Sequence, residues 1–167
     1  MIILETDRLY LRPYLDEDIK SIHDVFSDKE TMTFYPAPFT IKETTEWVKR
    51  NQLRYKEVGY GLWAVCLKET RALIGDCGLV KQKVDNQNEV EIGYHINKKF
   101  WSNGLATEAA SACKEYGFYQ LGLEKLISII DPSNRASIRV AEKIGFTKEK
   151  EAFIFNKNHA IYSGTKE

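Results

Sequence analysis

The stretch "FWSNGLATEAA", residues 100–110, joins two aromatic residues and a polar turn to an alanine-rich segment that predicts a helix. Gly104 and Ala106 have little or no side chain, so a ligand can approach the backbone of the first helical turn closely. The first N–H groups of a helix lack intrahelical partners, and the helix dipole favours an anion there. The stretch matches neither GxGxxG nor GxxxxGK[ST], the two common nucleotide motifs. It is therefore either an ordinary helix start, which is the simpler interpretation of the local pattern, or a cradle for a diphosphate.

The chain before this stretch shows the patterns of several short elements. Prolines exclude a helix interior at 35–39, which we expect to be a loop with exposed aromatic side chains. Thr40 and Glu43 form a capping-box pattern that opens a helix through about residue 55. Strands are predicted at 8–14, 62–68, 72–81 and 89–96, and a further helix at 16–28. In the strand at 89–96, even-numbered residues face one way and odd-numbered residues the other.

The chain after the stretch continues with both kinds of element. A helix is predicted at 104–120, a buried strand at 125–130, and a helix that ends at Gly145. Two final strands are expected at 146–155 and 159–165. This order predicts the α/β class: a mixed, mainly antiparallel central sheet with helices on both faces.

The length, charge and residue composition argue against several classes of protein. The length of 167 residues predicts a single domain over 1–167, and 24 basic against 24 acidic residues argue against a nucleic-acid-binding protein. The first ten residues form no signal peptide, and no apolar run spans a membrane, so we expect no membrane partner and a cytoplasmic location. The three cysteines form no CxxC pair and are expected to be small buried residues, while three scattered histidines predict no metal site.

Four motifs in order resemble the GNAT superfamily of acyl-CoA-dependent N-acetyltransferases. They resemble most the branch of the ribosomal-protein N-terminal-amine acetyltransferases, whose chains typically begin with TxRLxLRPxxxxD. The matching segments here are Thr6 to Asp18 with Arg8, Leu9, Leu11, Arg12 and Pro13, then "EIGYHI" (91–96), "WSNGLATEA" (101–109) and "DPSNRASIRVAEKIGF" (131–146). The resemblance covers nearly the whole chain and implies a GNAT-like fold with acetyl-CoA as co-substrate and no metal.

The resemblance implies a site for the CoA diphosphate at the opening stretch. The family signature [RQ]-x-x-G-x-[GA] matches at Gly104 and Ala106, while Trp101 stands at its first position. Backbone amides would do the binding, and the Thr107 hydroxyl could add a contact. The implied residues are Ser102, Asn103, Gly104, Leu105, Ala106 and Thr107.

In this family the strands before and after the long helix diverge, and the acyl-pantetheine arm lies between them. The resemblance places this gap between 89–96 and 125–130, where Gly93 suits a close approach. A backbone N–H in the run Tyr94, His95, Ile96 would polarise the thioester carbonyl.

Asn134 and Ser137 match the family's N-x-x-S, which implies that Asn134 contacts the pantetheine arm and that Ser137 lies near the CoA sulfur. The alternative interpretation makes Asn134 a turn residue and Ser137 a residue of the first helical turn. In many relatives a tyrosine at the position of Ala141 acts as the general acid toward the leaving thiolate. In this chain no residue fills that role, or Ser137 or a water molecule takes it.

Glu91 is the candidate general base. A free amine attacks a thioester, whereas an ammonium does not, so a carboxylate near the thioester would help. The alternative is an exposed carboxylate on a strand or a structural ion pair. Glu108 is expected to interact with the helix dipole, and His95, on the same face as Glu91, is expected to be structural.

These observations predict an enzyme that moves an acetyl group from acetyl-CoA to a primary amine, either a protein N-terminus or a small molecule, by direct attack in a ternary complex. A non-catalytic CoA-binding sensor and a thioester hydrolase using Ser137 are the alternatives. The acceptor and the existence of a homodimer stay open.

Overall fold

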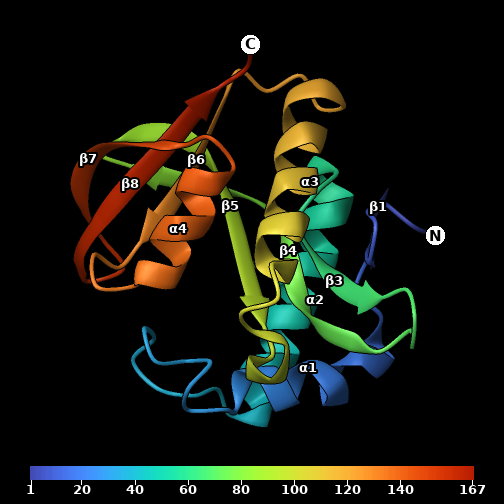
Figure 1. Cartoon of the computed structure of the whole chain (residues 1–167). Coiled ribbons are helices and arrows are strands. Elements are labelled where there is room, and N and C mark those ends of the chain that lie inside the picture. The colour runs from blue at the N-terminus through green and yellow to red at the C-terminus, as the bar shows by residue number, and fades with distance from the viewer.

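The computed structural model describes all residues, 1–167, and contains one sheet of eight strands with helices on both faces (Figure 1). The strands are β1 (Leu4–Glu5), β2 (Leu9–Arg12), β3 (Leu62–Leu67), β4 (Leu73–Val84), β5 (Gln87–Ile96), β6 (Lys125–Ile130), β7 (Thr147–Ile154) and β8 (Lys157–Thr165). The helices are α1 (Ile19–Phe26), α2 (Ile41–Val58), α3 (Leu105–Tyr119) and α4 (Arg135–Lys143), with short 3₁₀ helices η1 (Asp16–Asp18) and η2 (Lys98–Phe100). The predicted α/β class and the helices on both faces are confirmed.

The strand order is β1-β2-β3-β4-β5-β6-β8-β7, and every neighbouring pair is antiparallel except β5 and β6. The sequence patterns missed the two-residue β1 and both 3₁₀ helices, which are too short to show a period. They also ended β4 too early, at residue 81. The tight turn at Asp85 and Asn86, both with positive φ, lets β4 and β5 pair over ten residue positions.

The helix boundaries follow from capping groups. Thr40 Oγ1 accepts a hydrogen bond from the Glu43 N–H at 3.2 Å, and Glu43 Oε1 accepts one from the Thr40 N–H at 2.9 Å. The predicted capping box is therefore confirmed. At the other end, Gly59 adopts φ +86° and terminates α2 three residues beyond the predicted limit. None of the helices is both long and apolar enough to cross a lipid bilayer.

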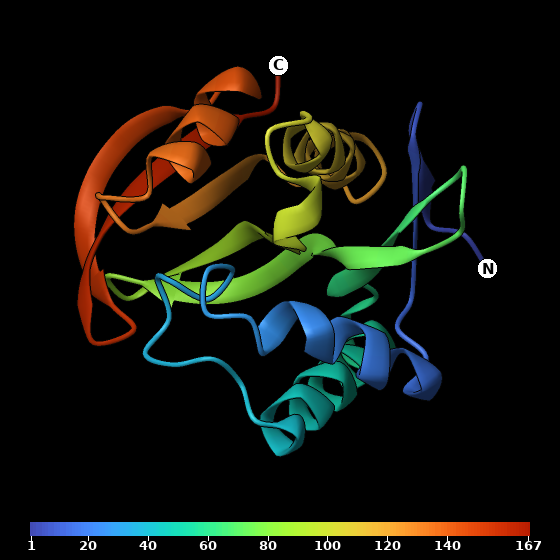
Figure 2. The same cartoon turned by 60° about the horizontal axis from the view of Figure 1, so that its bottom comes forward.

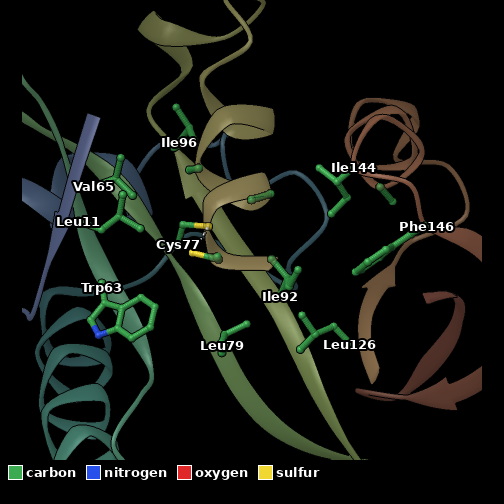
Figure 3. Packing of buried hydrophobic residues seen from close by; sticks show 14 of the residues in the cluster. Leu11, Trp63, Val65, Cys77, Leu79, Ile92, Ile96, Leu126, Ile144 and Phe146 are labelled. Carbon is green, nitrogen blue, oxygen red and sulfur yellow. Dashed lines mark hydrogen bonds between the residues drawn. The ribbon is translucent and has the colours of Figure 1, made fainter. Parts of the chain in front are cut away.

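Two hydrophobic layers hold the helices on the sheet. Helices α1 and α2 lie on one face, and α3 and α4 on the other (Figure 2). The larger cluster packs between α3, α4 and the sheet, with Cys77, Leu79, Ile92 and Leu126 at its centre (Figure 3). All three cysteines have no exposed surface and are unpaired, as the composition predicted.

Strands β5 and β6 diverge. They share a single paired position, Glu91 with Ile127, whereas β6 and β8 pair at six positions. Figure 1 shows the two strands separating toward their carboxyl ends. Because α3 follows β5 and α4 follows β6, both helices begin at this open end of the sheet.

Candidate active site

The turn at 102–107 presents a row of free backbone donors. No atom of the chain accepts a hydrogen bond from these N–H groups, and the first helical bond runs from the Glu108 N–H to the Gly104 carbonyl. Ser102 and Gly104 both have positive φ, which turns the chain sharply before α3. The side chain of Leu105 is buried in the core, so this residue offers only its backbone.

Two side chains flank the turn. The Trp101 indole N–H donates to the Ile96 carbonyl at 2.7 Å and so ties the turn to the end of β5. From the other side, the Arg8 guanidinium lies beside Gly104, with Nη2 3.5 Å from where a Cβ on Gly104 would be. The turn therefore combines free N–H groups, the positive end of a helix dipole and a nearby cation, all of which favour an anion.

The N-terminal motif supports the first turn of α3. Glu108 accepts hydrogen bonds from the Thr6 hydroxyl at 2.5 Å and from the backbone N–H and Nε of Arg8, each at 2.8 Å. Burial alone would raise the pKa of Glu108, but the hydrogen bonds from Thr6 and Arg8 outweigh it and lower that pKa. Glu108 thus does more than interact with the helix dipole, because it joins α3 to the β1–β2 segment.

At the start of α4, the N-x-x-S residues are hydrogen-bonded. Asn134 Oδ1 accepts from the Ser137 N–H at 3.2 Å, so Asn134 caps the helix. The Tyr94 hydroxyl, from β5, donates to Ser137 Oγ at 2.9 Å. Burial raises the pKa of Tyr94 to about 12. Ala141 is buried and belongs to the larger hydrophobic cluster. Sequence reasoning missed the bond between Tyr94 and Ser137.

Glu91 lies on the opposite face of β5. Its Oε1 accepts a hydrogen bond from Gln82 Nε2 at 3.0 Å. Burial raises the pKa of Glu91 to about 7, although this hydrogen bond and the positive charge of Arg54 pull it down. A carboxyl group with a pKa near neutrality is suited to accept a proton at neutral pH.

His95 shares this face with Glu91 and belongs to a polar cluster that sequence reasoning missed. Its Nδ1 lies 2.9 Å from Oδ1 of Asp76, a β4 residue with no exposed surface. Asp76 Oδ2 also accepts hydrogen bonds from the Tyr14 hydroxyl at 2.6 Å and from Trp47 Nε1 at 2.9 Å. On its other side, His95 Nε2 is hydrogen-bonded to the hydroxyl of Tyr35.

The predicted site residues therefore divide between the two faces of β5. The turn 102–107, Asn134, Ser137 and Tyr94 lie on the side of α3 and α4, while Glu91 and the His95 side chain lie on the side of α1 and α2. Strand β5, which pairs with β6 only at Glu91, lies between these two sides. The aromatic loop at 35–39, predicted from its prolines, supplies Tyr35.

Comparisons with known proteins agree with this geometry. The family model for the acetyltransferase (GNAT) domain matches residues 8–147. YkkB, an uncharacterized protein of Bacillus subtilis (strain 168), is 42% identical over 160 residues, which cover 95% of this chain and 93% of YkkB.

Among solved structures, an acetyltransferase of the GNAT family from Bacillus anthracis has a TM-score of 0.81 at 30% identity, covering 99% of this chain and 98% of that chain. RimL, a ribosomal L7/L12 alpha-N-protein acetyltransferase solved in complex with coenzyme A, also has a TM-score of 0.81, with 99% and 98% covered. Its identity is 16%, so this likeness concerns the fold alone. The chain belongs to the GNAT family and is an acyl-CoA-dependent acetyltransferase.

Proposed function

We propose that this enzyme transfers the acetyl group of acetyl-CoA to a primary amine by direct attack within a ternary complex. The observation that carries the proposal is the row of free N–H groups at 102–107, beside a gap between two parallel strands. In this proposal the CoA diphosphate binds at 102–107, the pantetheine arm passes Asn134 between β5 and β6, and the thioester lies near the backbone of 94–96. In this proposal the backbone N–H groups of 94–96 stabilise the negative charge that develops on the thioester oxygen during attack.

Direct attack is favoured because the chain offers no accessible activated nucleophile. The threonine hydroxyl that is bonded to a histidine, Thr44 to His23 at 2.7 Å, has no exposed surface. No serine or cysteine side chain is hydrogen-bonded to a histidine. The cysteines are buried, and burial raises the pKa of both Cys66 and Cys77. A covalent acetyl-enzyme would need a reactive thiolate or alkoxide, so the amine itself is the nucleophile.

Two groups supply the proton transfers. Glu91 accepts the proton that the ammonium must lose, since its pKa of about 7 matches this task. Ser137, with Tyr94 as its donor, delivers a proton to the departing CoA thiolate from the opposite face of β5. This assignment fills the role that Ala141 leaves empty.

An acceptor screen tests the proposal. Purified protein is offered acetyl-CoA with a panel of amines that includes peptides with free N-termini, polyamines and amino sugars. Free thiol and acetylated products are measured by a thiol reagent and mass spectrometry. We expect thiol release that depends on one class of primary amine. Equal release without any amine would indicate a thioester hydrolase, and no release with tight CoA binding would indicate a CoA sensor.

A further inference from the structure

The loop between α1 and α2 is attached to the end of β5. Figure 2 shows it leaving α1 and crossing the face of the sheet opposite α3 and α4. Lys98, just after β5, forms ion pairs with Asp28 at 3.2 Å and with Glu30 at 3.5 Å. Together with the hydrogen bond between Tyr35 and His95, these contacts hold the loop beside the gap.

The hydrogen bonds around His95 determine what its ring can do. Asp76 is fully buried and accepts bonds from three donors on separate elements, as an ionised carboxylate does. Because a carboxylate only accepts, His95 carries a proton on Nδ1, and in the neutral form of the ring Nε2 is left as an acceptor. The Tyr35 hydroxyl must then donate to Nε2, and its oxygen keeps lone pairs for another donor.

An aromatic enclosure keeps this arrangement fixed. The rings of Phe26, Tyr35 and Trp47 lie 5.1, 5.3 and 5.5 Å from the His95 ring, measured between centroids. The His95 side chain is only 9% exposed, so few waters can replace Tyr35 as its partner. Tyr35 itself remains 37% exposed, which leaves part of its surface open to a ligand.

Glu91 and the Tyr35 hydroxyl lie on the same side of β5. Glu91 and His95 are on one face of this strand, four positions apart, and the Tyr35 hydroxyl is hydrogen-bonded to His95 on that face. Both oxygens accept hydrogen bonds, so a molecule bound between them must donate two. A protonated primary amine has three N–H bonds, whereas a hydroxyl has one.

We propose that Tyr35 orients the acceptor amine, and that His95 and Asp76 are positioning residues that hold the Tyr35 oxygen as an acceptor for its N–H. The inference rests on the proposed function. One ammonium N–H is directed to Glu91 and loses its proton there. A second N–H is directed to the Tyr35 oxygen. After proton loss the amine rotates about its C–N bond, which turns the lone pair from Glu91 toward the thioester carbon while an N–H still faces the Tyr35 oxygen. The enzyme thereby selects primary amines over alcohols.

Kinetic comparison of two variants tests this proposal. Tyr35→Phe removes the acceptor oxygen, and His95→Asn keeps an N–H near Asp76 but is too short to reach Tyr35. Each should lower kcat/KM for the amine about 10- to 100-fold, mainly through KM, since a hydrogen bond to a charged group is lost. The double variant should lose no more than about twofold beyond either single variant, because one interaction is removed. The affinity for CoA, measured by calorimetry, should stay unchanged.

Tyr119→Phe is the matched control, because Tyr119 is exposed at the far end of α3 and its variant should behave as wild type. The inference would be overturned if the losses in kcat/KM of the two single variants multiply in the double variant, or if Tyr35→Phe leaves the KM for the amine unchanged. In either case, amine-dependent turnover by the wild type would leave the proposed function intact. NMR of the side-chain nitrogens of the three histidines gives a readout that needs no activity. Neutral His95 should carry its proton on Nδ1, and Nε2 should shift in Tyr35→Phe. A proton on Nε2 instead would refute the role of Asp76.

Discussion

Replacing Glu91 with glutamine separates a catalytic carboxylate from a structural one, because the two roles predict opposite changes in stability. The glutamine side chain keeps the size of Glu91 and can still accept the hydrogen bond from Gln82. It cannot take a proton from an ammonium. We expect kcat/KM to fall by on the order of 10²- to 10⁴-fold at neutral pH, the usual contribution of acid–base catalysis.

The pKa of Glu91 sets the effect on stability. Burial raises this pKa from its ordinary 4.5 to about 7, so the folded chain holds the proton over a range where the unfolded chain has released it. Stability from this group is therefore complete below pH 4.5, falls as pH rises from 4.5 to 7, and stays reduced above it. At 1.36 kcal/mol per pH unit the cost of ionising Glu91 reaches about 3 kcal/mol. The glutamine variant should be more stable than wild type at pH 8 by up to about this amount, and nearly equal at pH 4.5.

Urea unfolding at both pH values measures the change in stability, and thiol release across pH measures the change in kcat/KM. The wild-type kcat/KM should rise with pH through about 7, as Glu91 loses its proton. The variant should lack this rise, and its defect should shrink at high pH because more acceptor arrives as the free amine. If the variant is less stable than wild type at pH 8 and keeps its turnover, Glu91 is structural and the reasoning from its burial is wrong.

Three further variants test other parts of the structure. Gly104→Asn and Gly104→Asp both tolerate the left-handed backbone, and calorimetry should show weaker CoA binding for each, with Asp at least about 10-fold worse because its charge faces the diphosphate; equal and unchanged affinities would exclude binding at this turn. Tyr94→Phe and Ser137→Ala should each lower kcat by on the order of 10²-fold, and the pair together should lose little more; additive losses would show that the two hydroxyls act separately. Thr40→Ala should lower the free energy of unfolding by about 1 kcal/mol in urea titrations, because the N-cap of α2 is lost; unchanged stability would mean that the capping bond contributes nothing.

Much of the fold was predictable because its signals are local. The capping box at Thr40 and Glu43 and the alternation through β5 each depend on residues close together in the chain. The free N–H groups at 102–107 were also predictable, since any helix that begins after a sharp turn leaves its first donors unpaired. Elements of two or three residues, such as β1 and η2, were not predictable, because they are shorter than one repeat of any pattern.

The polar cluster around His95 could not be found in the same way. Asp76 lies 19 residues before His95, Tyr35 lies 60 residues before it, and each comes from a different element. In the sequence, Asp76 is a single acid within an apolar strand, and His95 is one polar residue in an alternating strand, so neither has a local partner. Their meaning depends on the antiparallel pairing of β4 with β5, which places Asp76 directly opposite His95.

The same pairing explains how His95, which the sequence pattern predicts to be structural, can influence the binding of the acceptor amine. A buried carboxylate must be satisfied, and Asp76 is satisfied by donors from β5, α2 and the segment after β2. Satisfying it fixes the protonated nitrogen of His95, which in turn makes Tyr35 a donor inward and an acceptor outward. The buried carboxylate of Asp76 therefore determines, through the His95 ring, which hydrogen bonds the Tyr35 hydroxyl makes in the exposed loop on the Glu91 side of β5. Activity variants in the loop should therefore be interpreted together with the state of Asp76, since a change at either end reaches the amine through the same two hydrogen bonds.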